Sequence, residues 1–482
     1  MAMGVQTVQS ERADSPLCVD LDGTLVRTDT LLECLLAIVR TNPFYLFRLL
    51  LTLFSGKAWF KQEVARVAAL SPDSLPYHDD LLEYLRTESR RGRRILLATG
   101  ADRSIAGAIA QRLGLFSGVI ASDGKQNLTG ARKLAAIRLV LANEPFSYVG
   151  NSRVDLEVWK HAQSAVIAGS GNRIEKEVQR AGVPIEKIFR RPRLSIRSFW
   201  RVARIHQWSK NVLVLVPIVL AHRMTNPPAL LNGLRCFFAF SFCASALYVI
   251  NDLFDLPMDR RHSRKRFRPI ASGDLPIPAA CALCGVLLAG ATILTPRGDA
   301  AWLLAAYAAS VITYSVYLKR FLMMDVILLA GFYTLRLLYG GAGTGITVSV
   351  WALAFSIFMF LSLALIKRIS DLRLRFSEEG VERSGRAYRA EDIVQLSSLC
   401  AASGCVSGLV TILYLQSSEV TSLYSRPHLL LGIFPLLVYW QSRLLILANR
   451  GEIQEDPVVF SLFDRASRAV ALAVFAVILA AI

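Results

Sequence analysis

The sequence has few acidic residues for its length and no N-terminal segment of the kind that directs secretion. Its 482 residues include 37 Asp and Glu against 55 Lys and Arg, which gives a formal net charge of +18. Residues 1–17 contain acids and no long apolar run, so we expect no signal peptide. The only C-x-x-C pair, Cys281 and Cys284, has no second Cys or His pair to accompany it, which argues against a zinc or redox site.

Apolar residues, in contrast, are abundant. They make up 53% of the chain, and the mean hydropathy of +0.41 is high for a soluble protein. Much of the second half consists of apolar runs of about 18 residues or more, the length that a helix needs to cross a bilayer. A strongly basic soluble protein would suggest nucleic acid as a partner. In a membrane protein the same charge indicates basic cytoplasmic loops, anionic lipid and phosphorylated substrates, so we expect a membrane protein that binds no nucleic acid.

The apolar runs predict nine membrane spans within residues 201–482. We place them at about 207–222, 229–250, 277–295, 299–317, 324–342, 348–368, 393–415, 427–447 and 465–482. Lys and Arg concentrate in the segments after the second, fourth and sixth spans. Basic segments stay on the cytoplasmic side, so we expect the N-terminal domain in the cytoplasm and the C-terminus outside.

Residues 15–171 alternate between short apolar runs and helical segments, which predicts an α/β (Rossmann-type) domain after a flexible N-terminus at 1–14. The runs expected to be strands lie within 17–25, 93–100, 118–124 and 146–155. The first of them, LCVDLDGTL, would present Asp20 and Asp22 in a crevice at the edge of the sheet. A basic linker follows at 172–200, which we interpret as a cytoplasmic segment next to the membrane.

Four motifs in this order resemble the haloacid dehalogenase (HAD) phosphatase superfamily. They are DLDGT at 20–24, Thr99, Lys133 and GNSRVD at 150–155. The resemblance implies that Asp20 is the nucleophile that accepts a phosphoryl group and that Asp22 is the general acid and base. It also implies that Thr99 and Lys133 hold the phosphoryl group and that Mg2+ is bound. The implied ligands of Mg2+ are Asp20, Asp22, Asn151 and Asp155.

One position departs from the HAD pattern, because Asn151 stands where the superfamily usually has aspartate. An amide oxygen is an uncharged ligand and binds Mg2+ more weakly than a carboxylate does. An active phosphatase and a degenerate regulatory or scaffolding domain are therefore both compatible with the sequence.

Residues 31–54 are unusually apolar for a soluble domain. Pro43 divides them, so neither half is long enough to span a membrane. We weigh two interpretations evenly, and both can hold. The segment forms cap helices on the phosphatase-like domain, or it forms interfacial helices that keep this domain against the bilayer.

An acidic motif followed at once by a basic run begins where the apolar run at 237–250 ends. Residues 251–273 read NDLFDLPMDRRHSRKRFRPIASG. On a helix that continued past 250, Asp252, Asp255 and Asp259 would share one face and would need a cation between them. Mg2+ together with a phosphate suits such carboxylates, and the basic run would hold that phosphate. Pro257 is expected to end or kink the helix, which allows Asp259 to sit on a loop.

Other polar residues recur at the predicted cytoplasmic ends of the spans, where charge is costly unless it has a function or anchors the helix. The candidate substrate-binding residues of the membrane part are Lys210, Asn211, Asn251, Lys265, Arg268, Tyr314, Lys319, Arg336, Lys367 and Arg368. Anchoring alone would explain Lys319, Lys367 and Arg368 equally well. Arg336 lies inside a predicted span, so we expect it to be functional or ion-paired within the bundle.

The membrane part resembles the UbiA prenyltransferase superfamily through N-D-x-x-D-x-x-x-D at 251–259 and the nine-span pattern over roughly 195–482. It looks most like the branch of decaprenyl-phosphate phosphoribosyltransferases. The matching segments are QWSKN at 207–211, the stretch 251–273, YSVYLK at 314–319 and LALIKRISDL at 363–372. Ordinary members carry a second aspartate-rich motif, whereas the corresponding segment here has Asp325 alone. A basic second site suits a polyprenyl monophosphate better than a second diphosphate with Mg2+.

This resemblance implies a transferase of the bacterial inner membrane that uses phosphoribosyl diphosphate (PRPP) and polyprenyl phosphate. Asp252, Asp255 and Asp259 would be the catalytic acids and would hold Mg2+ on the diphosphate of PRPP. The HAD-like domain would then remove the 5-phosphate of the product. Two alternatives are a prenyltransferase with an aromatic or quinone acceptor and a membrane scaffold in which only the HAD-like domain is active. The sequence carries no signal for an oligomeric state.

Overall fold

The computed structural model describes most of the chain and divides it into two compact units. The described residues are 15–52, 54, 56–68, 70–169, 172–190, 195–377, 388–415, 424–453 and 456–481. The first unit runs to Val202 and also contains Val249–Leu283, and the second contains Ala203–Tyr248 and the chain from Cys284 onward. The flexible N-terminus expected at 1–14 lies outside the described residues.

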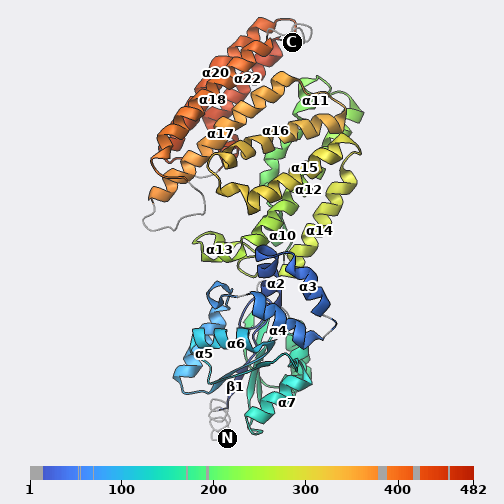
Figure 1. The fold of residues 1–482 in the computed structure, drawn as a ribbon, viewed down its shortest axis with the longest axis vertical. Coiled ribbons are helices and arrows are strands. Elements are labelled where there is room, and N and C mark those ends of the chain that lie inside the picture. Colours follow the sequence, from blue (N-terminus) through green and yellow to red (C-terminus); the bar gives the residue numbers. More distant parts are fainter. Residues whose placement is uncertain are drawn as a thin grey trace, which may run out of the picture. The chain divides into compact units, whose positions relative to one another are not determined.

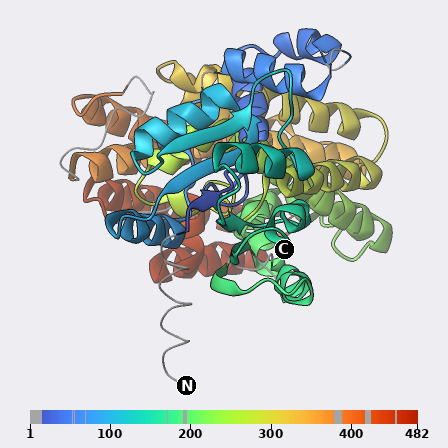
Figure 2. The ribbon, with the colours of Figure 1, turned by 90° about the horizontal axis from the view of Figure 1, so that it is seen from below.

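A parallel sheet of six strands forms the centre of the first unit (Figures 1 and 2). The strands are β1 (Leu17–Val19), β2 (Ile95–Asp102), β3 (Gly118–Ser122), β4 (Ser147–Gly150), β5 (Ser164–Gly169) and β6 (Ile185–Arg190). Their order is β3-β2-β1-β4-β5-β6. Leu17 of β1 pairs with Ile95 of β2 on one side and with Ser147 of β4 on the other. The connections change direction at β1, and such a switch point opens a crevice at the carboxyl ends of the strands.

Helices cover both faces of this sheet, because its strands carry apolar side chains on both sides. On β1, Leu17 and Val19 belong to the core on one face and Cys18 to the core on the other. Leu85 and Ile109 pack on the first face, and Ile137 packs on the second. The covering helices are α5 (Asp79–Arg90), α6 (Arg103–Leu113), α7 (Ala131–Val140), α8 (Leu156–Trp159) and α9 (Asn172–Arg180). The predicted α/β domain is thus confirmed.

The sheet extends past residue 171, where the predicted N-terminal domain ends. β6 pairs in parallel with β5, for example Ile188 with Ile167. The segment expected to be a linker at 172–200 therefore contains α9 and β6. Val178 of α9 and Phe189 of β6 are buried in the two cores, which explains why this basic segment folds with the sheet. The boundary of the domain moves to the residues after Arg190, and α10 (Ile196–Ala203) follows.

In the described part of the chain, three α-helices lie between β1 and α5. They are α2 (Thr30–Thr41), α3 (Tyr45–Thr52) and α4 (Lys57–Ala68), followed by the short η2 (Pro72–Ser74). Asp29 caps α2 by accepting hydrogen bonds from the N–H groups of Leu31 and Leu32. Pro43 lies between α2 and α3, so the apolar segment 31–54 is divided where the sequence predicts.

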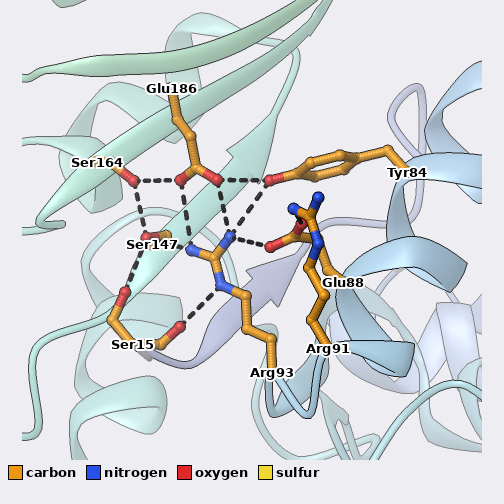
Figure 3. Close-up of polar contacts among 8 residues, drawn as sticks. All are labelled: Ser15, Tyr84, Glu88, Arg91, Arg93, Ser147, Ser164 and Glu186. Atoms are coloured by element: carbon orange, nitrogen blue, oxygen red, sulfur yellow. Dashed lines mark hydrogen bonds and ion pairs between the residues drawn. The ribbon is translucent and has the colours of Figure 1, made fainter. Parts of the chain in front are cut away.

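Arg93, just before β2, ties several elements of the sheet together (Figure 3). Its side chain is 1% exposed and lies 3.0 Å from the carboxylate of Glu88 and 2.8 Å from that of Glu186. Its Nη2 also donates to the hydroxyl of Ser147 at 2.8 Å. Glu88 belongs to α5, Ser147 to β4 and Glu186 to β6, so one guanidinium joins three elements.

We expect Glu186→Gln to weaken the first unit at neutral pH and to reduce its loss of stability in acid. Burial alone would raise the pKa of Glu186, but hydrogen bonds from Arg93, Tyr84 and Ser164 hold this pKa below its ordinary value of 4.5. A lowered carboxyl pKa stabilises the fold above the ordinary value, and that contribution is lost as the pH falls through the lowered value. Arg93 is buried but Glu186 is partly exposed, so we expect the loss of this pair to cost about 1 kcal/mol.

Amide hydrogen exchange of β4, β5 and β6 in the full chain, compared between neutral pH and about pH 4, measures this effect. Glu83→Gln, on the exposed side of α5, is the matched control. Equal acid sensitivity of Glu186→Gln and the unchanged protein would contradict the prediction.

The second unit is helical, and α12 and α14 each contribute residues to both units. Between α12 (Pro227–Phe254) and α14 (Ile277–Leu294), α13 (Leu256–Arg261) and η5 (Lys265–Phe267) belong to the first unit. The other elements of the second unit are η4 (Ile205–Leu215), α11 (Val216–Leu220), α15 (Asp299–Val316), η6 (Leu318–Arg320), α16 (Met324–Thr344), α17 (Val350–Ser377), α18 (Asp392–Leu415), η7 (Pro427–Gly432), α20 (Ile433–Asn449), α21 (Pro457–Phe463) and α22 (Arg465–Ala481). In Figure 1, α17, α18, α20 and α22 lie side by side, and neighbouring members of this set are in contact.

Seven helices in the described part of the chain are long and apolar enough to cross a membrane. They coincide with the second to eighth predicted spans. The first predicted span corresponds to a shorter apolar segment, Ile205–Leu220, and the ninth to α22, which has 17 residues. A count of nine spans therefore stays a prediction at these two places.

Candidate functional site

The carboxyl ends of β1 and β4 present connected, buried polar side chains. Asp20 directly follows β1, and its Oδ1 accepts a hydrogen bond from Lys133 Nζ of α7 at 2.8 Å. Lys133 also donates to the hydroxyl of Tyr148 at 2.9 Å, and that hydroxyl donates to Asp155 Oδ1 at 2.9 Å. Lys133 Nζ lies 3.7 Å from Asp155 Oδ1, so two carboxylates share one ammonium group.

The other residues of the four sequence motifs lie at the same edge of the sheet. Asp155 Oδ2 accepts a hydrogen bond from the N–H of Asn151 at 3.1 Å. The side chain of Asn151 lies against Gly23, where an added Cβ would come within 2.2 Å of the Asn151 amide nitrogen. Thr99 of β2 is fully buried, and its hydroxyl accepts a hydrogen bond from the N–H of Ala101 at 3.0 Å. Residues from three separate strands therefore meet at the predicted edge of the sheet.

Burial perturbs the two aspartates that follow β1. It raises the pKa of Asp20 above the ordinary value, although the ammonium group of Lys133 opposes this. Burial and the charge of Asp29 raise the pKa of Asp22 to about 7. Asp22 Oδ1 accepts a hydrogen bond from the N–H of Thr30 at 2.8 Å, which fixes it at the start of α2. A carboxyl group with a pKa near neutral is suited to exchange protons as a general acid or base.

The acidic motif begins on α12 and continues on a separate short helix. α12 ends at Phe254, and α13 follows with Asp255 at its N-cap and Pro257 in its first turn. The predicted helix break at this proline is confirmed. Asp259 lies on α13 and not on a loop, which corrects that expectation. The reason is that proline is compatible with the first turn of a helix, where its missing N–H has no intrahelical partner to lose.

Two of the three aspartates converge on one guanidinium. Arg268 Nη1 donates to Asp252 Oδ1 at 3.1 Å and to Asp259 Oδ2 at 2.6 Å. Asp252 is 5% exposed and Asp259 is 3% exposed. Asp255 instead accepts a hydrogen bond from Asn251 Nδ2 at 3.0 Å. The acidic motif is therefore a buried pair that shares a cation, with Asp255 held beside it.

The donor chemistry of both sets of acids fits Mg2+. Within the described ranges, no three Asp, Glu, His or Cys side chains gather as a ready metal site. Each set nevertheless directs two carboxylates at one cationic nitrogen, Lys133 Nζ in the first and Arg268 Nη1 in the second. Carboxylate oxygens are the protein ligands that Mg2+ prefers. Lys265 Nζ lies 4.0 Å from Asp259 and adds a second positive charge to that set.

In the second unit, α16 approaches η4 closely at Gly340. An added Cβ there would lie 2.0 Å from the carbonyl oxygen of Val214, so a larger residue would require the backbone to move. Lys210 and Asn211 lie on η4, and Arg336 lies on α16. This close approach brings three of the predicted substrate-binding residues to one place.

Asp456, which directly precedes α21, pairs with two of the predicted lysines. Its Oδ2 accepts hydrogen bonds from Lys210 Nζ at 2.7 Å and from Lys367 Nζ at 3.2 Å. The hydroxyl of Tyr333 lies 3.5 Å from its other oxygen. Burial alone would raise the pKa of Asp456, but the two lysines hold this pKa well below the ordinary value. Asp456 therefore stays ionised and holds two ammonium groups from η4 and α17 together.

Arg336 is buried between an amide and several aromatic rings. Its Nε donates to Asn211 Oδ1 at 2.9 Å, and its Nη1 donates to the carbonyl of Phe332 at 2.5 Å. The guanidinium carbon lies 5.0 Å from the ring centre of Phe240 and 5.2 Å from that of Tyr333. Cation–π contacts stabilise a desolvated guanidinium in such a place. Within the bundle, the partners of Arg336 are therefore the amide of Asn211 and several aromatic rings.

Three further predicted residues have other surroundings. Arg368 forms a buried ion pair with Asp325, and the hydroxyl of Tyr388 donates to the other oxygen of Asp325 at 2.6 Å. Tyr314 packs edge-on against an aromatic ring of α16. Lys319 is half-buried on η6. The structure therefore joins Lys210, Lys367, Asn211 and Arg336 into one group and gives Arg368 a separate ion pair.

The match to a known protein family covers the helical part of the chain. The model of the UbiA prenyltransferase family matches residues 212–455. The chain belongs to the UbiA prenyltransferase family. It is therefore a multi-pass membrane protein of a transferase family, in agreement with its seven long apolar helices.

Individual relatives cover different shares of this UbiA-family chain. An uncharacterised protein of Sinorhizobium fredii, y4nM, is 36% identical over 94% of this chain and 88% of its own length. The decaprenyl-phosphate phosphoribosyltransferase of Mycobacterium tuberculosis is 36% identical over 39% of this chain and 63% of that protein. A solved UbiA homologue from Archaeoglobus fulgidus, bound to GPP and Mg2+, has a TM-score of 0.45 and 17% identity over 58% of this chain and 99% of its own.

Sequence reasoning missed several residues of the polar groups in the two units. Asp456 had a detectable signal, since Asp followed by Pro457 is typical of a helix start and acids are scarce in this half of the chain. Tyr333 and Tyr148 had none, because a tyrosine in an apolar helix or strand is usually an ordinary core residue. Their hydroxyl contacts appear only when distant segments are packed together.

We expect Asp456→Asn to lower the free energy of unfolding by about 3 kcal/mol, because two lysines would remain partly buried without their counter-charge. Thermal unfolding of the purified full chain in detergent measures the change. Asp464→Asn is the control, since Asp464 pairs with one cation, Arg443, and not with two. We expect that control to lose about 1 kcal/mol or less. An equal loss in both variants would show that the contact of Asp456 with Lys210 and Lys367 stabilises the protein no more than the ion pair of Asp464 does.

Proposed function

We propose that this UbiA-family protein transfers the 5-phosphoribosyl group of PRPP to a polyprenyl phosphate at the cytoplasmic face of the bacterial inner membrane. Its similarity to decaprenyl-phosphate phosphoribosyltransferase supports the substrate pair. The segments QWSKN, 251–273, YSVYLK and LALIKRISDL carry this resemblance in the sequence.

The observation that carries the proposal is the state of Asp325. This residue stands alone where other UbiA-type enzymes have a second aspartate-rich motif. Its two oxygens are occupied by Arg368 and by the hydroxyl of Tyr388. A carboxylate neutralised in this way is poorly suited to hold a second diphosphate through a metal ion. The nearby basic residues instead favour a ligand that has negative charge of its own, such as a lipid monophosphate.

The residues of the second unit would bind this acceptor. Lys210 is buried, Lys367 is partly exposed, and Asp456 holds the two together. An incoming phosphate would accept hydrogen bonds from the same ammonium groups in competition with Asp456. Arg336 is fixed by Asn211 and would strengthen the positive potential. Such a preorganised cationic group orients the lipid phosphate without a large rearrangement.

The buried acids of the 251–273 segment would serve the donor. Asp252 and Asp259 would hold Mg2+, which supplies charge neutralisation for the departing diphosphate when it is bound. Arg268 and Lys265 would contact phosphate oxygens of PRPP. An oxygen of the lipid phosphate then forms a bond to C1 of the ribose while the bond from C1 to the diphosphate oxygen breaks. The chain needs no covalent nucleophile for this exchange.

The crevice of the first unit supports a second step. We propose that Asp20 accepts the 5-phosphate of the product and that Asp22, with its raised pKa near neutral, donates a proton to the departing hydroxyl. Thr99 and Lys133 would hold the phosphoryl group. Asn151 and Asp155 would complete the magnesium ligands, with the amide as the weaker of the two. Water would then hydrolyse the phosphorylated Asp20, which releases inorganic phosphate and regenerates the carboxylate. The lipid product of this step would be a polyprenyl-phosphoryl ribose.

Incubation of membranes containing the protein with PRPP labelled in the ribose tests the proposal. We expect the label to move into extracted lipid when polyprenyl phosphate is present. A second label on the 5-phosphate reports the other step, because it should be lost from the lipid as inorganic phosphate. Consumption of a polyprenyl diphosphate with an aromatic acceptor, and no reaction of PRPP, would support the aromatic prenyltransferase alternative instead.

A further inference from the structure

One side of α3 in the first unit exposes large apolar side chains. Phe44, Phe47 and Leu51 are three and four positions apart, so they share one side of a helix, and Phe54 follows. Their exposed fractions are 79%, 71%, 68% and 91%. Leu49, on the other side, is 2% exposed and packs into the core of α2 and α4. We call these four residues the α3 face. Several large apolar side chains exposed in one short segment mark a candidate interaction site.

Along the segment that contains the α3 face, the charged residues have one sign. The chain contains no Asp or Glu from Cys34 to Gln62. Arg40, Arg48 and Lys57 lie in this segment and are exposed. Aromatic and aliphatic side chains next to basic residues are typical of helices that lie in the interface of an anionic bilayer.

A buried ion pair connects the helix before α3 to the segment between two membrane helices. Arg260 of α13 contacts both carboxylate oxygens of Glu33 of α2, at 2.7 and 3.0 Å. These side chains are 8% and 4% exposed. Arg260 also donates to the carbonyls of Ala271 and Ser74, both at 3.0 Å. α13 lies between α12 and α14, which are both long and apolar enough to cross a membrane. The first unit therefore carries the α3 face together with the ends of two such helices.

We propose that the α3 face docks on the surface of an anionic lipid bilayer, with the three exposed basic residues next to the lipid phosphates. The apolar side chains would enter the boundary between headgroups and acyl chains. This inference goes beyond the transfer reaction and does not depend on which substrates the protein uses. The crevice beside Asp22 is lined by α2 and α4, with Cys34 and Val64 among its walls. Docking through α3 would hold that crevice at the membrane surface.

The test places a nitroxide label on the α3 face of the full chain in lipid nanodiscs. The exposed Cys281 and Cys405 are replaced by serine, and Leu51→Cys carries the label. Oxygen concentrates in the bilayer, whereas a nickel chelate stays in water, so relative accessibility to the two reports insertion. In discs of phosphatidylcholine with phosphatidylglycerol, we expect the label at position 51 to be accessible to oxygen and shielded from nickel.

Leu139→Cys is the matched control, because Leu139 is an apolar residue of the same unit that is 84% exposed on α7. A label there should stay accessible to nickel in every lipid. Equal nickel accessibility at positions 51 and 139 would overturn the proposal. Dipolar broadening at position 51 that disappears on dilution with unlabelled protein would also overturn it, because it would identify a second copy of the chain as the occupant.

A second variant tests the role of charge. Arg48→Gln with Lys57→Gln leaves the α3 face intact but removes two of its basic neighbours. We expect the docking equilibrium in phosphatidylglycerol discs to fall about fivefold for each charge removed, which corresponds to about 1 kcal/mol each. The same shift in discs of pure phosphatidylcholine would contradict recognition of anionic lipid.

Discussion

Asp259→Asn is expected to reduce the transfer of ribosyl phosphate by on the order of a thousandfold, because several kcal/mol of charge stabilisation would be lost. Asp259 is buried, and it shares the guanidinium of Arg268 with Asp252. An asparagine keeps the shape of the side chain but removes one of the two charges that would hold Mg2+. We therefore expect the residual activity to need more Mg2+ than the unchanged protein does.

Diphosphate release from PRPP in the presence of polyprenyl phosphate measures this effect. Asp274→Asn is the matched control, because Asp274 belongs to the same segment but its side chain is 36% exposed. We expect that control to change the rate by no more than about twofold, as for most exposed substitutions. Elution volume and thermal unfolding establish that both variants are folded. If a folded Asp259→Asn protein transfers ribosyl phosphate at the full rate, the pair of Asp252 and Asp259 takes no part in the mechanism.

Asp20→Asn is expected to lower the release of inorganic phosphate by at least about a thousandfold, since an amide cannot replace a carboxylate nucleophile. The release of diphosphate should not change, because Asp20 follows β1 and takes no part in the acidic motif. The variant should therefore accumulate a lipid product that keeps its 5-phosphate. This separation of the two products is the strongest consequence of the proposed second step.

Both products can be measured in one reaction with PRPP labelled in the ribose and in the 5-phosphate. Asp80→Asn, at an exposed position on α5, controls for the loss of a negative charge in the same unit. If Asp20→Asn still releases inorganic phosphate, the phosphatase role is wrong while the transferase role stands. If neither phosphate nor lipid label appears with the unchanged protein, the transferase role itself fails.

The parts of the fold that follow from local pattern were predictable. Short apolar runs between helical segments predicted the α/β domain, and long apolar runs predicted the membrane helices. β6 was missed because its strand, IEKIFR, alternates with charged residues and lies in a basic segment that reads as a linker. Only its pairing with β5 and the burial of Phe189 show that it belongs to the sheet.

The sequence predicted many residues of the candidate sites, but it did not predict which of these residues contact one another. The spacing of Asp252, Asp255 and Asp259 predicted a shared face, and the structure gives Asp252 and Asp259 one common partner in Arg268. No local sequence pattern predicts the contact between Asp456 and Lys210, which lies 246 positions earlier. Such contacts depend on helix packing, for example on the close approach of α16 and η4 at Gly340.

The ion pair between Arg260 and Glu33 has a kinetic consequence. Arg260 directly follows Asp259, and Glu33 lies one turn after Thr30, whose N–H is bonded to Asp22. The acids proposed to bind the donor and the crevice proposed for the second step would therefore be tethered within the first unit, and passage of the intermediate between them would be intramolecular. Short tethers give effective concentrations in the millimolar range. The second step would then use the intermediate made by the same protein molecule in preference to the same compound added in dilute form. We expect this preference to weaken in Glu33→Gln.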